Sequence, residues 1–278
     1  MAKIIAIANQ KGGVGKTTTS VNLAACLAAA EKRTLIIDLD PQGNASACLG
    51  LEKAKFENAN IYHALISEEK IEACIYETEL PSLEICPSNN DLVGAELELV
   101  QMLARESKLK GALESIADRY DYIIIDCAPS LNLLTVNALT AAHTYLVPMQ
   151  TEYLAMEGLS QLLNTVRLIR SSLNQNLTLE GILLTMYDSR NNLCKLVAND
   201  LMEHFKDDIL KTIIPRNVKL SECPSFGKPI ILYDITSKGS EAYLSLAREL
   251  ILKSETKKEK VAAPVQQIPK FEDYQIHS

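Results

Sequence analysis

Tryptophan is absent from this 278-residue chain, and aromatic residues make up only 5% of it. The core must therefore be aliphatic, which favours strands rich in Val, Ile and Leu under helices rich in Ala and Leu. No hydrophobic run approaches the ~18 residues that a membrane span requires. The first apolar run, residues 4–8, is followed at once by polar residues and glycines, unlike a signal peptide. We therefore expect a cytoplasmic protein and no membrane partner.

The seven cysteines are scattered and odd in number, and they contain no Cys-x-x-Cys pair. This pattern argues against a disulfide framework or a zinc site and is typical of buried, reduced thiols in the cytosol. The net charge of −7 argues against a chain that is basic all over, but it leaves room for a local basic patch. The four histidines show no recognisable metal-ligand spacing.

Short apolar runs alternate with helical stretches, which is the pattern of a parallel α/β sheet. The run at residues 122–126 is almost wholly apolar, which indicates a strand buried on both faces. We predict one α/β domain with a twisted, mainly parallel sheet and helices on both faces. Expected strands span residues 3–8, 34–38, 83–86, 122–126, 144–148, 178–185 and 209–214. Expected helices span residues 17–30, 92–117 with a break near Ser107 or Gly111, 158–171, 193–205 and 238–253.

The character of the sequence changes after about residue 253. The stretch Lys257-Lys258-Glu259-Lys260 leads into a polar segment that contains Pro264 and Pro269 and has no periodicity. Such a segment has too few apolar residues to bury against a core. We therefore predict a folded domain over residues 1–253 and a disordered tail over residues 254–278.

A glycine-rich loop stands between the first expected strand and the first expected helix, Gln10-Lys11-Gly12-Gly13-Val14-Gly15-Lys16-Thr17-Thr18. Glycines let backbone N–H groups close around phosphate oxygens, and the helix N-terminus adds partial positive charge. Lys16 can reach the β- and γ-phosphates, while the Thr17 hydroxyl can bind Mg²⁺. The usual Gly-x-x-x-x-Gly-Lys-[Ser/Thr] pattern has glycine where this chain has Gln10. A second lysine, Lys11, stands at the mouth of the loop.

The segment Lys-Gly-Gly-x-Gly-Lys-Thr-Thr resembles the deviant Walker A motif of the ParA/MinD ATPases. The resemblance implies a P-loop NTPase fold over residues 1–253 and Mg²⁺-dependent hydrolysis of ATP. It also implies that Lys11 reaches the nucleotide of a second subunit, neutralising charge on the transferred phosphate, so that ATP joins a homodimer. The implied nucleotide-binding residues in the loop are Lys11, Gly12, Gly13, Val14, Gly15, Lys16, Thr17 and Thr18.

Carboxylates follow two of the expected strands. Asp38 and Asp40 project from the same side of an extended chain, at the edge where ligands of such sheets bind. The stretch 38–44 resembles the family's Asp-x-Asp-Pro-Gln-Gly-Asn, which implies that Asp40 orients the attacking water and Asp38 joins the Mg²⁺ shell. Asp126 resembles the Walker B aspartate, which implies that it holds Mg²⁺ through water and fixes the Thr17 hydroxyl. The implied catalytic residues are Lys11, Lys16 and Asp40, and the implied metal residues are Thr17, Asp38 and Asp126.

Residues 185–190 and 214–220 match the ParA/Soj partitioning branch, and the resemblance spans residues 3–253. It implies that Pro215 and Asn217 line the adenine and that Arg190 and Lys219 contact DNA. Members of this branch bind double-stranded DNA without sequence preference in their ATP state. A ParB/Spo0J-type centromere-binding protein stimulates their hydrolysis. The expected function is therefore chromosome or plasmid partitioning by a nucleoid-associated ATPase.

Three other interpretations share parts of this pattern. A MinD-like positioning ATPase needs a basic amphipathic helix at its C-terminus, whereas this tail contains two prolines and Glu272-Asp273. An electron carrier similar to nitrogenase reductase needs paired cysteines around a cluster, and Cys127 has no evident partner in the sequence. A small-molecule kinase needs a lid with catalytic arginines, and arginines are few in this chain.

Overall fold

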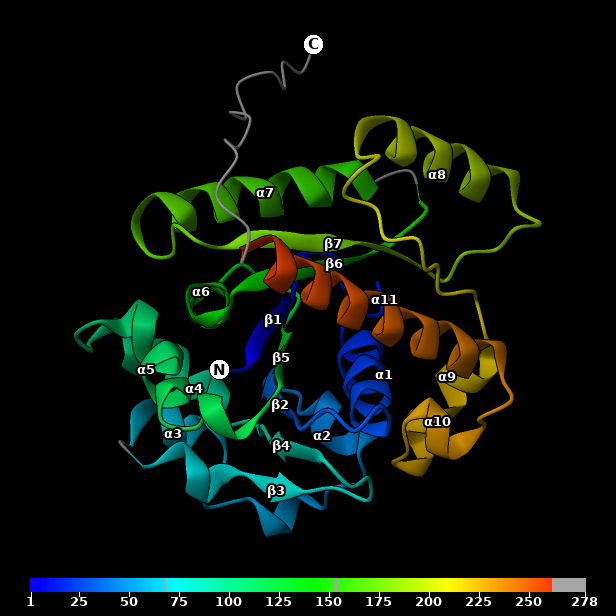
Figure 1. Cartoon of the computed structure of the whole chain (residues 1–278). Helices are drawn as coiled ribbons and strands as arrows, with labels where there is room; N and C mark the ends of the chain where they lie inside the picture. The colour runs from blue at the N-terminus through cyan, green and yellow to red at the C-terminus, as the bar shows by residue number, and fades with distance from the viewer. Residues whose placement is uncertain (68, 153–154, 262–278) are drawn as a thin grey trace.

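The computed structural model describes residues 1–67, 69–152 and 155–261. Across these ranges, a seven-stranded sheet lies at the centre of the molecule in the order β3-β4-β2-β5-β1-β6-β7 (Figure 1). Neighbouring strands pair in parallel, except β3 and β4, which are antiparallel. The strands are β1 (Lys3–Ile7), β2 (Thr34–Leu39), β3 (Tyr76–Glu77), β4 (Leu83–Cys86), β5 (Tyr122–Cys127), β6 (Thr144–Gln150) and β7 (Thr178–Thr185).

Helices cover both faces of the sheet, which confirms the predicted fold class (Figure 1). One layer contains α1 (Lys16–Ala29), α2 (Asn44–Cys48), α9 (Val218–Glu222), α10 (Ile230–Tyr233) and α11 (Lys238–Val261). The opposite layer contains α3 (Ile61–Ile66), α4 (Leu92–Val100), α5 (Lys108–Glu114), α6 (Leu133–Ala141), α7 (Ala155–Ser172) and α8 (Asn192–His204). Short 3-10 turns lie at Lys53–Lys55, Ile71–Cys74, Arg105–Ser107, Ala117–Arg119 and Cys223–Phe226.

The strands supply side chains to two apolar cores because successive residues of a strand point to opposite faces. In β1, Ile5 and Ile7 belong to the core beneath α1, whereas Ile4 and Ala6 belong to the core on the other face. Every residue of β2 and β5 is buried. These two strands lie inside the sheet under helices on both sides, which is why their sequences are almost wholly apolar.

The strand predicted at residues 209–214 is wrong. Isolated bridges join this part of the chain to β7 and the residues after it, but no continuous ladder forms among the described residues. The backbone N–H groups of Lys211 and Thr212 instead donate to the carboxylate of Glu249 on α11, each at 2.9 Å. The Glu249 carboxylate thus satisfies two backbone donors between Leu210 and Ile214, whose own N–H groups donate to β7.

The long helix predicted at residues 92–117 is divided into α4 and α5. Ala104 lies between them with a φ of 52°, a left-handed conformation that interrupts a right-handed helix. The interruption extends to Ser107, the first of the two expected positions, whereas Gly111 lies within α5. Helix α11 continues past its expected end at residue 253 to Val261. Residues 262–278 of the predicted tail lie outside the described residues.

Candidate nucleotide-binding site

The glycine-rich loop connects β1 to α1 at the carboxyl edge of the sheet, as predicted. Gly13 and Gly15 have φ values of 73° and 86°, which side chains disfavour and glycine adopts freely. A Cβ atom built on Gly12 or Gly13 would meet no atom within 4 Å among the described residues, so the loop faces open space. Within the same part of the structure, no side chain caps the N-terminus of α1. Its first N–H groups therefore remain available to phosphate oxygens, so the loop fits a nucleotide.

Two side chains that the sequence did not single out anchor this loop to the neighbouring strands. Asn9 donates from Nδ2 to the carbonyl oxygen of Pro148 in β6 at 2.8 Å, and its Oδ1 accepts from the Lys11 backbone at 3.0 Å. Thr185, at the end of β7, donates its hydroxyl hydrogen to the carbonyl oxygen of Val14 at 2.8 Å. Hydrogen bonds therefore fix the loop backbone near its start, at Lys11, and near its end, at Val14.

Lys16 lies inside the loop and is only 6% exposed. Its Nζ donates to the carbonyl oxygen of Lys11 at 3.1 Å, which places the ammonium group against the loop backbone. Burial lowers the pKa of Lys16, while the negative charges of Asp126 and Asp40 oppose this shift. A buried ammonium group of this kind gains most from an added anion, because little water competes for it.

Asp126 is joined to α1 by two hydrogen bonds. Thr17 Oγ1 donates to its Oδ2 at 2.8 Å, and Ser20 Oγ donates to its Oδ1 at 2.7 Å. The carboxyl group is fully buried, and its burial and the charge of Asp38 raise its pKa. A hydrogen bond thus joins two of the three predicted metal residues, Thr17 and Asp126. A hydroxyl oriented by a carboxylate is an oxygen ligand suited to Mg²⁺.

The third predicted metal residue, Asp38, already has hydrogen-bond donors on both carboxylate oxygens. Its Oδ2 accepts from Ser46 N at 2.9 Å and from Ser46 Oγ at 2.7 Å, and its Oδ1 accepts from Asp40 N at 3.2 Å. Asp38 lies beside Asp126 in the register of β2 and β5. Burial raises the pKa of Asp38, and the charge of Asp40 adds to the increase. In this structure, Asp38 orients the turn that carries Asp40.

Asp40 follows β2 and is 8% exposed. Its Oδ1 accepts a hydrogen bond from Gln42 N at 3.0 Å. Its negative charge acts on the ammonium group of Lys16 and on the carboxyl group of Asp126. The predicted catalytic carboxylate is therefore part of the same charged site as the phosphate loop.

The side chain of Lys11 interacts with a residue that the sequence did not indicate. Its Nζ is 2.5 Å from Glu152 Oε2, and the two side chains are 34% and 50% exposed. Glu152 follows β6, so this ion pair joins the mouth of the loop to the end of a neighbouring strand. The amine of Lys11 thus lies at the surface while that of Lys16 lies inside the loop.

The residues predicted to line the adenine lie near the other side of the loop. Pro215 forms a bridge with Tyr187, just after β7, and the methyl carbon of Met186 lies 3.6 Å from the Cβ position of Gly15. Asn217 caps α9, with its Oδ1 accepting from Leu220 N at 3.3 Å. The end of β7 therefore connects the segment around residues 215–217 to the phosphate loop.

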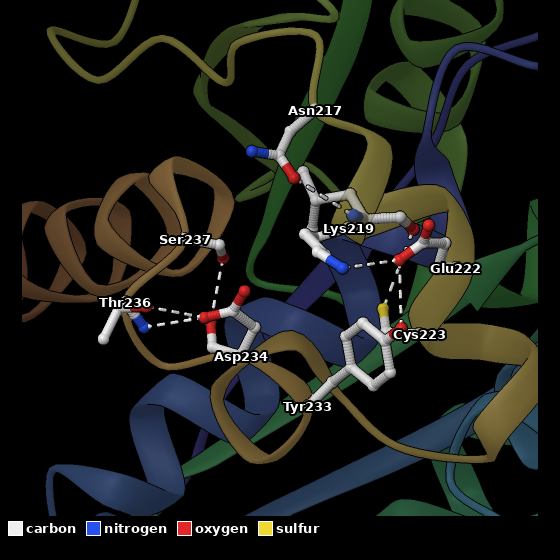
Figure 2. A network of polar contacts seen from close by, with 9 residues as sticks. Asn217, Lys219, Glu222, Cys223, Tyr233, Asp234, Thr236 and Ser237 are labelled. Carbon is white, nitrogen blue, oxygen red and sulfur yellow. Dashed lines mark hydrogen bonds and ion pairs between the residues drawn. The ribbon is translucent and has the colours of Figure 1, made fainter.

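The two cations predicted to contact DNA lie after β7 and on α9. Arg190 is 86% exposed and donates to Asp188, which precedes it by two residues. Lys219 is 46% exposed and pairs with Glu222, within the network of polar contacts in Figure 2. Both cations are accessible to a large ligand, and each has a carboxylate as its neighbour.

A family model described as an AAA domain matches residues 2–179. The parallel sheet, the phosphate loop and this match define a P-loop nucleoside-triphosphatase. The chain is 56% identical to the sporulation initiation inhibitor protein Soj of Bacillus subtilis over 250 residues, which cover 90% of this chain and 98% of Soj. It is 55% identical to the chromosome partitioning protein ParA of Myxococcus xanthus over 251 residues, covering 90% and 88% of the two chains. The chain belongs to the ParA/Soj family of chromosome-partitioning ATPases.

A solved structure provides a further comparison. Cobyrinic acid a,c-diamide synthase from Mycobacterium smegmatis, with bound ADP and magnesium, has a TM-score of 0.81 and 36% sequence identity, and the match covers 92% of this chain and 97% of that one. A second structure of that protein contains an ATP analogue and magnesium. These ligands are of the kind predicted for this chain, and the family confirms the prediction of an ATP hydrolase.

Two further observations concern membrane-crossing helices and Cys127. Among the helices of residues 1–67, 69–152 and 155–261, none combines the length and apolarity that a membrane crossing requires. Cys127 is buried, and its Sγ lies 3.9 Å from the carbonyl oxygen of Ile125, so its thiol points into the core. Burial raises the pKa of this thiol well above its usual range, which makes it a poor thiolate ligand for a cluster.

Proposed function

We propose that this chain is an ATP-switched dimer that binds nonspecific double-stranded DNA in its ATP state and drives chromosome or plasmid partitioning. The observation that carries the proposal is the different placement of two lysines at one phosphate loop. Lys16 lies buried within the loop, whereas Lys11 stands at its mouth with its side chain 34% exposed. Lys16 would contact the phosphates of the nucleotide bound in its own copy. Lys11 would then contact the nucleotide bound in another copy.

The proposed chemistry divides the work among the residues of the site. Bound ATP and Mg²⁺ supply the phosphoryl group and a cation that screens its charge. Thr17 and Asp126 would hold the cation, Thr17 through its hydroxyl oxygen. Asp40 orients the attacking water, and Lys11 of the other copy neutralises charge on the transferred phosphate. Hydrolysis would then remove the contact that joins the two copies.

The position of α9 supports a link between nucleotide and DNA. Asn217, proposed to contact the adenine, caps α9, and Lys219, proposed to contact DNA phosphate, lies in the first turn of the same helix. Arg190 lies three residues after Tyr187, which bridges to Pro215 beside Asn217. A change of nucleotide at this segment would therefore act on the backbone that carries both cations.

Dimerisation matters because the chain as a whole has a net charge of −7. A few cations on one copy can neutralise few phosphates, and nonspecific affinity rises steeply with the number neutralised. Two copies would double that number on one face. Cargo selection and stimulation of hydrolysis would come from a ParB/Spo0J-type centromere-binding partner, and the ATP-bound dimer would associate with the nucleoid.

The test is binding to nonspecific duplex DNA by the Asp40→Ala protein, with ATP or ADP, across a salt series. We expect tight, salt-sensitive binding that requires ATP. Arg190→Ala or Lys219→Ala should weaken this binding. Light scattering on the same samples should report a dimer with ATP and a monomer with ADP. If DNA is ignored with every nucleotide while the dimer still forms, the proposed cargo is wrong. A positioning ATPase acting on a membrane or protein cargo would then be the better account.

A further inference from the structure

Both cations assigned to DNA in the proposed function are ion-paired within their own chain. Lys219 Nζ lies 3.0 Å from Glu222 Oε2, one turn later at the end of α9. Arg190 donates from Nε and Nη2 to the two carboxylate oxygens of Asp188, at 2.9 and 2.8 Å. A DNA phosphate would therefore approach two cations that already have anionic partners.

Glu222 is also held in place from a second helix. Tyr233, at the end of α10, donates its hydroxyl hydrogen to the same Oε2 at 2.9 Å (Figure 2). The Tyr233 ring lies 5.6 Å from Lys219 Nζ and packs against Phe226, with the two ring centroids 5.0 Å apart. The hydrogen bonds from Lys219 and Tyr233 keep the pKa of Glu222 below its usual range, so it is anionic at neutral pH. Glu222 is thus a fixed acceptor, and the Lys219 ammonium group lies against both its carboxylate and the Tyr233 ring.

Asp188 is fixed in a similar way by its own turn. Besides the two guanidinium contacts, its Oδ1 accepts from the Arg190 backbone N–H at 3.0 Å. The paired geometry is bidentate, which is the same geometry by which arginine grips a phosphate. A phosphate that binds Arg190 through both nitrogens must therefore displace the Asp188 carboxylate from them.

We infer that Glu222 and Asp188 are internal counterions that restrain DNA binding, because a phosphate must compete with a carboxylate for each cation. This inference rests on the proposed binding of DNA by Lys219 and Arg190. Exposed ion pairs are weak, so a phosphate can displace them, but each displacement lowers the affinity of a single copy. The restraint would make tight binding depend on two copies acting together and would favour release when the dimer separates.

The experiment measures binding of the full chain to nonspecific duplex DNA with a non-hydrolysable ATP analogue, at several salt concentrations. Glu222→Gln should tighten binding by about two- to fivefold. It should also steepen the slope of log K against log salt by up to about 0.9, because one more phosphate is neutralised. Asp188→Asn should act in the same direction through Arg190. In a Lys219→Ala background, Glu222→Gln should lose most of its effect.

Two further variants separate a specific ion pair from a general loss of negative charge. Tyr233→Phe keeps the ring and removes the hydroxyl that fixes Glu222, so it should tighten binding modestly without any change of charge. Asp234→Asn is the matched control. The Asp234 carboxylate lies nearby, and its charge acts weakly on Lys219. Its Oδ1 accepts from Thr236 N and Oγ1, at 3.1 and 2.8 Å, rather than from Lys219 (Figure 2). This control should change affinity less than Glu222→Gln and leave the salt slope unaltered.

The outcomes distinguish this inference from the proposed function. If Lys219→Ala weakens DNA binding but Glu222→Gln leaves it unchanged, DNA binding stands and the internal counterion is refuted. Equal tightening by Asp234→Asn and Glu222→Gln would also refute it, because bulk charge would then explain both. If the wild-type chain and Glu222→Gln both ignore DNA with the ATP analogue, the proposed function fails and the inference fails with it.

Discussion

Thr17 Oγ1 donates a hydrogen bond of 2.8 Å to Asp126 Oδ2, although the two residues lie 109 positions apart in the chain. The contact forms because β1 and β5 are neighbours, which brings the start of α1 to the end of β5. It fixes the direction of the Thr17 hydroxyl before any cation binds. Preorganised oxygen ligands of this kind are what a weakly held Mg²⁺ requires.

We predict that Thr17→Ala reduces the contribution of Mg²⁺ to nucleotide affinity by about tenfold, because a ligand oxygen is removed from the cation. Titration of a fluorescent ATP analogue with Mg²⁺ and with EDTA measures that contribution directly. Thr17→Ser retains the hydroxyl and serves as the control, with a response close to that of the wild type. A Thr17→Ala protein that responds to Mg²⁺ as the wild type does would show that the residue is not a ligand.

The pair Asp38 and Asp126 predicts an unusual dependence of stability on pH. Burial raises the pKa of both carboxyl groups, so the folded, nucleotide-free protein holds protons that the unfolded chain releases above about pH 4. This contribution to stability is therefore largest below about pH 4, where both states are protonated, and is lost as the pH rises from there through the raised pKa values of the folded state. Urea unfolding of the nucleotide-free protein should show this fall between about pH 4 and pH 7.

Asp126→Asn isolates the contribution of one member of the pair. The amide cannot ionise, so the variant should be more stable than the wild type at pH 8, by roughly 1–3 kcal/mol. The difference should shrink at pH 5, where the wild-type carboxyl group is largely protonated. If the two proteins differ equally at both pH values, ionisation of Asp126 is not the cause.

Much of this site could be predicted from sequence because its parts are local. A strand, a glycine loop and a helix follow one another directly, so the placement of Gly13, Gly15 and Lys16 needs no knowledge of the rest of the fold. The register that sets Asp38 beside Asp126 is different, since it depends on β2 and β5 being neighbours. Strand order arises from long-range packing, which a linear pattern does not contain.

The residues that the sequence did not indicate are those that act across strands. Asn9 and Glu152 have ordinary polar side chains and no motif, and Thr185 begins a matched segment that indicates no contact with the loop. Their contacts to the loop depend on the positions of β6 and β7. The wrong strand at residues 209–214 has the same origin. Its apolar pattern was suitable, but the carboxylate of Glu249 lies near enough to take its backbone donors.

Lys16→Ala should weaken ATP binding by roughly 10- to 100-fold, because it removes a buried charged donor that no water can replace. Isothermal titration with ATP and Mg²⁺ gives the affinity. Lys53→Ala removes an equal charge from an exposed 3-10 turn and should leave the affinity unchanged. Equal ATP affinities for the Lys16→Ala and wild-type proteins would show that Lys16 does not contact the phosphates.

Lys11→Ala should have a different effect, since Lys11 stands at the mouth of the loop with its amine beside Glu152. We expect ATP affinity to remain within about twofold of the wild type, because Lys16 still serves the loop. The ATP-dependent dimer should be lost, and light scattering at saturating ATP measures it. A Lys11→Ala protein that dimerises normally with ATP would exclude a role across the interface.

Asp40→Ala should lower the rate of ATP hydrolysis by about 10²- to 10⁴-fold while leaving ATP bound, because a water-orienting carboxylate acts on the chemical step. The dimer formed with ATP should then persist for hours rather than decay with turnover. Asp40 also accepts a hydrogen bond from Gln42 N at 3.0 Å, so the alanine variant alters the turn as well as the charge. Asp40→Asn keeps an oxygen acceptor for that N–H and removes only the charge. Both variants should lose hydrolysis, as measured by phosphate release, and normal turnover by Asp40→Asn would assign the water to another residue.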